Sequence, residues 1–279
     1  MNLAIDAGGT NLRASIYKEN HSEITAKAKS NEIGLASFIE GILNKHKNIK
    51  TICISYAGQV QDGIIIDSPN IKVDIKNIKE YFKTKYNIPL FIENDLTCAV
   101  IAEASELKSK YICALYIGTG LGLGAIDNGN ILKGSTNLTC EIGHMPYKKA
   151  PFKCGCGRDN CIENFVSGIG IIKWIKYYNL TCEPTLEALK NDSNPNSKKI
   201  LKEFEKALLH VTGTTITLFN PEILVLGGGI IEGNPYLVDK IVSNIDNYAL
   251  KSSLKNCKIV KSQLKEAPLI GASLLKEIV

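Results

Sequence analysis

Three cysteines and a histidine in the middle of the chain have the spacing of metal ligands. Cys154, Cys156 and Cys161 fall within eight residues, in a Gly-rich stretch that offers little core in which unconnected thiols could be buried. Thiolates grouped in this way are typical ligands of a tetrahedral Zn²⁺ ion. The fourth ligand is either His144, ten residues before Cys154, or its rival Cys140. Four protein ligands leave no open position, so we expect a structural zinc ion.

A carboxylate precedes a Gly-rich turn near the start of the sequence. Asp6 follows an apolar run, and Gly8, Gly9 and Thr10 separate that run from a second one at residues 12–17. A turn without side chains lets backbone N–H groups approach a phosphate closely, and Asp6 is a potential partner for a hydrated metal ion. The alternative is an ordinary hairpin whose glycines are needed for positive φ. This stretch alone leaves both interpretations open.

A second turn of the same kind follows the apolar run 111–117. It contains Gly118, Thr119 and Gly120, and an apolar run follows it again. Two strand–turn–strand units in one chain suggest two lobes of related design. Each lobe would then offer a phosphate loop to a shared cleft.

Two further strand ends carry candidate site residues. Asn94 and Asp95 follow the short apolar run 90–92 and precede a helical pattern, which is a common place for a catalytic group in α/β proteins. Either residue can instead cap the helix. Gly227 and Gly228 also follow an apolar run. Their bare backbone could admit a flat group such as adenine, or could simply turn the chain into a helix.

The remaining sequence is that of a well-packed globular protein. Its 279 residues are 44% hydrophobic and 22% charged, enough for one large domain or two lobes. Short apolar runs alternate with segments of helical periodicity, among them 32–48, 75–86, 198–219 and 236–250, and the polar stretch 191–197 is predicted to be a linker. This alternation indicates an α/β fold.

Charge, hydropathy and cysteine usage limit the partners and the location. The net charge of +5 is dispersed over Lys-rich segments without a long basic block, so we expect no nucleic-acid partner. No apolar run reaches the ~18 residues of a membrane span, so we expect no membrane association. Nine cysteines without secretory features favour reduced thiols, and the expected location is the cytoplasm.

In their order along the chain, these stretches resemble the ROK family of sugar kinases, within the sugar kinase/Hsp70/actin superfamily. The pairing of Glu-x-Gly-His with Cys-x-Cys-Gly-x-x-x-Cys-x-Glu is highly specific, whereas each Gly-rich turn alone is not. The resemblance spans nearly the whole chain and is carried by residues 6–10, 93–95, 118–122, 141–144, 154–163 and 226–229.

The resemblance implies a fold and a division of the chain. The expected architecture is α/β, a two-lobed actin-like ATPase (ribonuclease H-like) fold with an interlobe cleft. We expect an N-terminal α/β lobe at residues 1–111, with the C-terminal helix 266–279 packing back on it. Residues 112–265 would form a C-terminal α/β lobe with a zinc-binding loop at 141–163.

The resemblance also implies an activity. The expected reaction is ATP-dependent phosphorylation of a hexose or N-acetylhexosamine at the C6 hydroxyl, with glucose favoured and N-acetylmannosamine or N-acetylglucosamine as the alternative. Asp95 would be the general base that takes the proton of the attacking hydroxyl. The implied cofactors are ATP, Mg²⁺ and structural Zn²⁺, and a homodimer is expected. The family includes sugar-responsive regulators that carry a helix-turn-helix domain before the phosphate hairpin, and because Asp6 lies close to the first residue we expect a kinase and not such a regulator.

Site residues follow from the same resemblance, position by position. The implied sugar ligands are Asn94, Asp95, Glu141, His144 and Glu163, with Gly58 and Asn70 as further candidates. The implied nucleotide and Mg²⁺ residues are Asp6, Gly8, Gly9, Thr10, Gly118, Thr119, Gly120, Gly227 and Gly228. The implied zinc ligands are His144, Cys154, Cys156 and Cys161, and one ring nitrogen of His144 could hold zinc while the other contacts the sugar.

The sequence departs from the family pattern in the approach to Glu141. Residues 135–140, Ser-Thr-Asn-Leu-Thr-Cys, replace a small, Gly-rich stretch. This loop is expected to meet the sugar. The change therefore bears on which sugar is preferred and leaves the reaction class standing.

Overall fold

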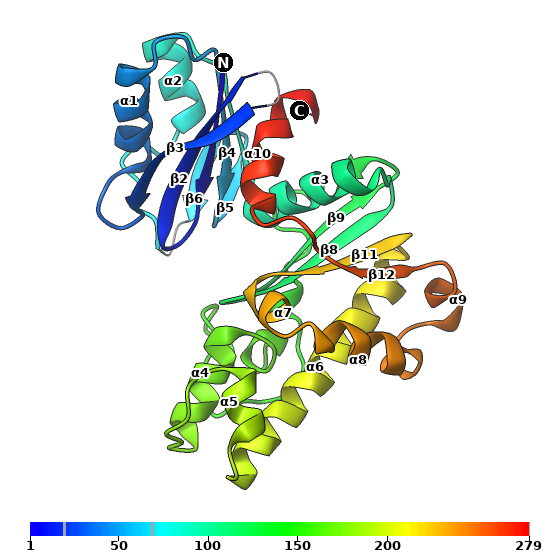
Figure 1. The fold of residues 1–279 in the computed structure, drawn as a ribbon. Helices are drawn as coiled ribbons and strands as arrows, with labels where there is room; N and C mark the ends of the chain where they lie inside the picture. Colours follow the sequence, from blue (N-terminus) through cyan, green and yellow to red (C-terminus); the bar gives the residue numbers. More distant parts are fainter. Residues whose placement is uncertain (19–20, 68–69, 279) are drawn as a thin grey trace. The chain divides into compact units, whose positions relative to one another are not determined.

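Two five-stranded mixed sheets organise the chain in the computed structural model, which describes residues 1–18, 21–67 and 70–278 (Figure 1). Each sheet is the centre of one unit. The first unit comprises Met1–Lys108, Lys133–Thr139 and Leu264–Val279, and the second comprises Ser109–Leu132 and Cys140–Gln263. The chain therefore leaves and re-enters the first unit twice.

The elements of the first unit are named in chain order. Its strands are β1 (Asn2–Ala7), β2 (Asn11–Lys18), β3 (His21–Lys29), β4 (Thr51–Tyr56), β5 (Gln59–Gln61), β6 (Ile64–Asp67) and β7 (Leu90–Asn94). Its helices are α1 (Leu35–Lys45), α2 (Ile78–Tyr86), α3 (Asp95–Leu107) and α10 (Ala267–Ile278).

The second unit is built of more helices. Its strands are β8 (Ile112–Ile117), β9 (Leu121–Asp127), β10 (Asn130–Ile131), β11 (Ile223–Gly227) and β12 (Lys258–Lys261). Its α-helices are α4 (Gly168–Tyr177), α5 (Leu186–Asn191), α6 (Pro195–Phe219), α7 (Gly229–Gly233), α8 (Tyr236–Asn244) and α9 (Lys251–Leu254). Its 3₁₀ turns are η1 (Ile142–His144), η2 (Ile162–Asn164) and η3 (Ile245–Asn247).

The two sheets have the same topology. The first has the strand order β3-β2-β1-β4-β7, in which β1–β2 and β2–β3 are antiparallel and the other pairs are parallel. The second has the order β10-β9-β8-β11-β12 with the same directions. The two glycine turns, β1–β2 and β8–β9, therefore occupy equivalent positions. The predicted α/β fold with two lobes of related design is confirmed.

Helices cover both faces of the first sheet. Leu3 and Ile5 of β1 join one buried cluster with residues of α1 and α2 such as Ile39 and Phe82. Side chains alternate between the faces of a strand, and α10 contacts β1 and β4 as well as α3 (Figure 1). Helix α10 thus brings residues 267–278 onto a sheet formed by the first hundred residues.

The contact between α10 and α3 depends on a missing side chain. A methyl group on Gly271 of α10 would overlap the carbonyl oxygen of Cys98 in α3. The neighbouring Ala99, Ala102 and Ala272 are all buried. Small residues on both helices therefore permit the close approach of their backbones.

We expect Gly271→Ala to destabilise the protein by about 2–3 kcal/mol, because α3 backbone would have to move out of a packed core. An alanine in a helix otherwise stabilises by about 0.5–1 kcal/mol relative to glycine. Gly41 of α1 is the matched control, because a methyl group there would meet no atom within 4 Å. Urea unfolding of both variants measures the difference. Stabilisation by both alanines would contradict the close approach.

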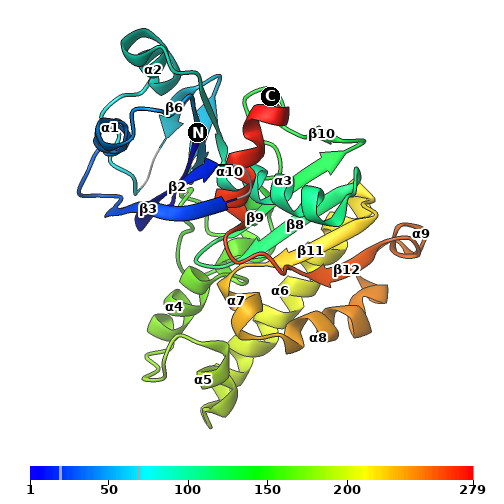
Figure 2. The same cartoon turned by 45° about the horizontal axis from the view of Figure 1, so that its top comes forward.

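In the second unit, α6 is the longest element (Figure 2). Its buried residues Phe204, Leu208 and Val211 belong to one cluster with Leu115 of β8 and Leu123 of β9. In the described parts of the chain, no helix is long and apolar enough to cross a membrane.

Some predicted element boundaries are wrong. The predicted linker 191–197 contains the start of α6, where Asn194 caps the first turn and Pro195 begins the helix. The predicted helix 236–250 ends at Asn244 and continues as a 3₁₀ turn. Strand β3 was not predicted, because the polar stretch His21–Lys29 carries few apolar residues.

Candidate active site and metal centre

Candidate residues of the first unit follow three adjacent parallel strands. Ala7 at the end of β1 pairs with Tyr56 of β4, and Tyr56 pairs with Asn94 of β7. The carboxyl ends of these strands meet at one edge of the sheet, which is the usual ligand-binding edge of an α/β sheet. These strand ends are followed in the chain by the turn 8–10, by Gly58 and by Asp95.

The turn between β1 and β2 presents bare backbone. Gly8 and Gly9 are not among the residues with positive φ, so the explanation of these glycines as a hairpin requirement for positive φ is wrong. The Gly8 N–H donates to the Asn11 carbonyl at 3.1 Å. Gly9 and Thr10 are exposed and line a cavity of about 620 Å³. Asn70 lines it too, and a methyl group on Gly9 would lie 3.5 Å from the Asn70 Cβ.

Asp6 is buried behind this turn and is held by an arginine. Arg13, its pairing partner on β2, donates from Nη2 to Asp6 Oδ2 at 2.6 Å and from Nη1 to Glu266 at 2.7 Å. Burial raises the pKa of Asp6, and the Arg13 hydrogen bond and charge oppose that rise only in part. Asp6 Oδ1 accepts a long hydrogen bond, 3.4 Å, from Ser55 Oγ. This oxygen fits the role of facing a hydrated Mg²⁺ ion.

Asn94 and Asp95 lie where β7 passes into α3. Asn94 Oδ1 accepts from the N–H of Leu96 at 2.9 Å and from that of Thr97 at 3.4 Å, so the capping alternative is confirmed for Asn94. Its Nδ2 donates to the Gly58 carbonyl at 3.3 Å. Asp95 is the first residue of α3. Its carboxylate therefore lies at the positive end of the α3 helix dipole.

In the second unit, Glu163 supports the other glycine turn. The Leu121 N–H donates to Glu163 Oε2 at 3.1 Å, and a methyl group on Gly120 would lie 2.9 Å from that oxygen. The start of α4 also contacts the turn, because the Gly168 N–H donates to the Gly118 carbonyl at 2.8 Å. Thr119 at the tip is exposed. Glu163 is thereby brought directly beside the turn 118–120.

The glycines after β11 differ in their surroundings. The ring of Tyr116 lies against Gly227, 2.7 Å from where a Cβ would be, so a flat group already covers this backbone. Gly228 has φ +87°, which favours glycine. A Cβ on Gly229 would meet no atom within 4 Å, and one on Gly118 would lie 4.0 Å from the Gly229 nitrogen. The open backbone nearest the turn is therefore at Gly229, and contact of adenosine with Gly227 and Gly228 stays a prediction.

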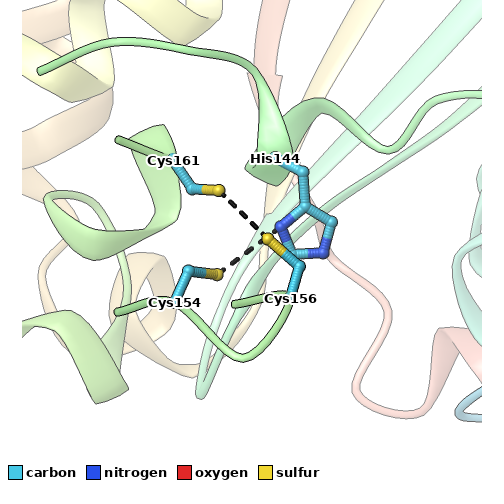
Figure 3. Close-up of side chains that lie close together, drawn as sticks. All are labelled: His144, Cys154, Cys156 and Cys161. Carbon is cyan, nitrogen blue, oxygen red and sulfur yellow. Dashed lines mark hydrogen bonds between the residues drawn. The ribbon is translucent and has the colours of Figure 1, made fainter. Parts of the chain in front are cut away.

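Four candidate metal ligands converge in the second unit (Figure 3). The ligand atoms of His144, Cys154, Cys156 and Cys161 all lie within 4.8 Å of one another. His144 Nδ1 is 3.6 Å from Cys154 Sγ, and the Sγ atoms of Cys156 and Cys161 are 3.3 Å apart. Tetrahedral zinc with bonds of about 2.0–2.3 Å separates its ligand atoms by roughly 3.5–3.8 Å. The set fits a zinc ion, and among the described residues Cys140 lies outside the group.

Further contacts orient these ligands. Arg158 donates to the His144 carbonyl at 2.6 Å. Burial opposes ionisation of Cys156, but hydrogen bonds from Arg158 and the neighbouring thiols lower its pKa to about 6. His144 Nε2 lies 3.9 Å from Glu141 Oε2. The ring thus turns Nδ1 to the thiols and Nε2 to a carboxylate, an arrangement that fixes the orientation of metal-binding histidines.

Two carboxylates adjoin the metal ligands. Partial burial raises the pKa of Glu141, and Glu163 raises it further, while His144 opposes the rise. Glu163 Oε1 accepts from Cys154 Sγ at 3.3 Å. The zinc ligands, Glu141, Glu163 and the turn 118–120 therefore form one connected cluster within the second unit.

Sequence reasoning missed several contacts of the site residues. Arg13 could have been found from the hairpin register, because a four-residue connection at 8–11 places it opposite Asp6. Lys133 and Asn137 bind Glu93, which directly precedes Asn94 and Asp95. No local pattern connects residues this far apart in the sequence. The roles of the predicted residues as sugar, nucleotide and metal ligands stay predictions.

Equivalent sheets, each with a glycine turn after its central strand, define this molecule as a protein of the actin-like ATPase fold. The chain belongs to the ROK family, whose sequence profile matches residues 2–278. The fold is that of a ROK family glucokinase from Streptomyces griseus, solved in complex with glucose and AMPPNP. That structure matches with a TM-score of 0.76 and 21% identity over 99% of both chains.

Curated relatives include kinases and regulators. An N-acetyl-D-glucosamine kinase of Yersinia enterocolitica is 32% identical over 154 residues, which are 50% of this chain and 51% of that protein. The DNA-binding transcriptional dual regulator NagC of Escherichia coli is 25% identical over 256 residues, 85% of this chain and 63% of that protein. The matches thus span about half of the kinase and less than two thirds of the regulator.

Proposed function

We propose that the protein is an ATP-dependent sugar kinase that phosphorylates a hexose or an N-acetylhexosamine at its C6 hydroxyl. The observation that carries the proposal is the position of Asp95. This carboxylate begins α3 at the strand edge that also carries the bare turn 8–10 and the buried Asp6. A base and a phosphate-binding turn at one edge are what phosphoryl transfer to a hydroxyl requires.

In the proposed mechanism, each residue binds, orients or accepts a proton. Asp95 accepts the proton of the sugar hydroxyl as that oxygen attacks the γ-phosphorus, and Asn94 helps to hold the sugar. In each unit, backbone N–H groups of the glycine turn can bind phosphate oxygens. Asp6, fixed by Arg13, would hold hydrated Mg²⁺, which neutralises phosphate charge when bound.

The zinc ligands have a structural role in this proposal. A closed set of four protein ligands cannot activate water. It would instead fix the loop that carries Glu141, His144 and Glu163, which we propose as sugar ligands. His144 can do both, since Nδ1 faces the thiols and Nε2 points away from Cys154 towards Glu141.

Two acceptors come first for testing. Glucose is the acceptor favoured by the family resemblance, and a glucokinase with bound glucose shares the fold. N-acetylglucosamine is the alternative, because the Yersinia relative is named as a kinase for that sugar. A regulatory role without catalysis is the competing function, since NagC also matches. Asp95 favours the kinase, because sugar-responsive binding alone needs no general base.

A coupled assay with Mg-ATP over glucose, mannose, fructose, N-acetylglucosamine and N-acetylmannosamine tests the proposal. We expect ADP release that depends on one or two of these sugars. Sugar binding without ADP release from any of them would contradict the kinase and favour the regulator. Sedimentation of the same sample tests the proposed homodimer.

A further inference from the structure

We propose that Asn137 and Lys133 are positioning residues that act through Glu93. By holding Glu93 they fix the neighbouring Asn94 and Asp95, which we place on the sugar side of the site, and so help to set the sugar preference. The inference rests on the proposed function. It concerns the segment in which the sequence departs from the family pattern.

The segment Lys133–Thr139 belongs to the first unit, although the chain on both sides of it belongs to the second. Side-chain contacts explain this placement. Glu93 is 7% exposed, and its two carboxylate oxygens have different partners. Oε1 forms an ion pair with Lys133 Nζ, and Oε2 accepts from Asn137 Nδ2 at 3.1 Å. A buried carboxylate is costly without such partners, and here both come from one segment.

A second set of bonds ties the same segment to β5. Asn137 Nδ2 also donates to the Val60 carbonyl at 2.9 Å, and Gln59 Nε2 donates to the Thr136 carbonyl at 3.3 Å. The adjoining Gly58 accepts from Asn94. Residues 133–139, the stretch 58–60 and the end of β7 are thus joined by one network of hydrogen bonds.

This network is next to the proposed chemistry along the chain. Glu93 is followed directly by Asn94, a proposed sugar ligand, and by Asp95, the proposed base. Gly58 is a further proposed sugar contact. The bonds of Lys133 and Asn137, which we call the tether, therefore hold the backbone of Asn94, Asp95 and Gly58. Small displacements of such residues have large effects on reaction rate.

The backbone conformation at Asn137 is one that glycine could also adopt. Its φ is +58°, in the left-handed region that glycine and asparagine tolerate best. Asparagine keeps the backbone conformation that glycine would allow and adds the amide that binds Glu93 and Val60. Asn137 therefore holds the segment 133–139 more rigidly than a glycine at this position would.

Asn137→Gly is the test variant, because it removes the tether and preserves the backbone conformation. Asn87→Gly is the matched control, since Asn87 is an exposed residue of the same unit with φ +53°. For each protein, calorimetry gives the Kd of glucose and of N-acetylglucosamine, and the coupled assay gives KM for the sugar and for Mg-ATP. Thermal melting checks that both variants are folded.

We expect Asn137→Gly to weaken binding of the preferred sugar roughly tenfold, to reduce the ratio between the two sugars and to leave the KM for Mg-ATP within twofold. Lys133→Arg, which preserves the ion pair, should stay near the wild type. If Asn137→Gly does not fold, Lys133→Gln provides the same comparison. Sugar affinities and preference equal to those of Asn87→Gly would overturn the proposal.

The calorimetric readout separates this inference from the proposed function. Sugar binding without turnover by the wild type would contradict the kinase, yet the sugar Kd values of the variants would still decide the role of Asn137. A wild type that binds no sugar would overturn both.

Discussion

Asp95→Asn is expected to lower kcat by about 10²–10⁴-fold, the usual contribution of a general base. The amide has nearly the shape of the carboxylate but cannot take the proton of the attacking hydroxyl. Binding of sugar and Mg-ATP should change only a few-fold, because Asn94 and the glycine turns keep their positions. Asn94 would still cap α3 through the N–H groups of Leu96 and Thr97.

Steady-state kinetics and calorimetry of the purified variant measure the two effects separately. Asp246→Asn is a suitable control, since Asp246 is an exposed residue of the second unit, outside the candidate site. Normal sugar binding with undiminished turnover by Asp95→Asn would overturn the assignment of the base. Loss of sugar binding would show instead that Asp95 acts chiefly as a ligand.

Cys156→Ser is expected to lose zinc, with metal analysis falling from about one ion per chain to nearly none. Structural zinc sites bind with about 10–16 kcal/mol, so that one of four ligands accounts for roughly 10²–10³-fold in affinity. The loop 141–163 would lose order with the metal, because binding of the metal and local folding are coupled.

Trp174 reports on this loop, because it is the only tryptophan of the sequence. Its ring centroid lies 5.0 Å from that of Phe152, two residues before Cys154. The adjacent Lys173 donates to the Lys153 carbonyl at 2.7 Å. Chelation of zinc from the wild type should therefore change the tryptophan fluorescence, and Cys156→Ser should show the altered spectrum without chelator.

Cys182→Ser is the matched control for this experiment, since Cys182 lies in the same unit outside the ligand group. It should keep its zinc and the wild-type fluorescence. Zinc retained at full occupancy by Cys156→Ser would refute the ligand set. Zinc lost without a change in fluorescence would refute only the coupling to Trp174.

Local spacing was enough to predict that the three cysteines come together, but it left His144 and Cys140 as alternatives for the fourth position. His144, Cys154, Cys156 and Cys161 lie within eighteen residues, so a few tight turns bring them together wherever the rest of the chain goes. The glycine turns and the junction at Asp95 were predictable for a similar reason. Each follows a short apolar run that can only be a buried strand.

Two contacts of the site residues were missed, and only the first of them could have been found from the register of a local hairpin. Arg13 reaches Asp6 because β1 and β2 pair residue 6 with residue 13. Glu93 contacts Asn137 because the segment Lys133–Thr139, which follows β10 in the chain, belongs to the first unit. Neither sequence pattern nor charge spacing specifies such a return. Strand β3 was missed because it is an edge strand rich in polar residues, without a clear apolar alternation.

The placement of α10 has a consequence for synthesis on the ribosome. The first sheet and α3 are complete in sequence by Leu107, but the helix that packs against them begins at Ala267. At about 5–20 residues per second, the ribosome needs roughly 8–30 s to make the intervening chain. Throughout that interval the small-residue face of α3 has no partner helix. The unit that is translated first is therefore the one whose packing is completed last.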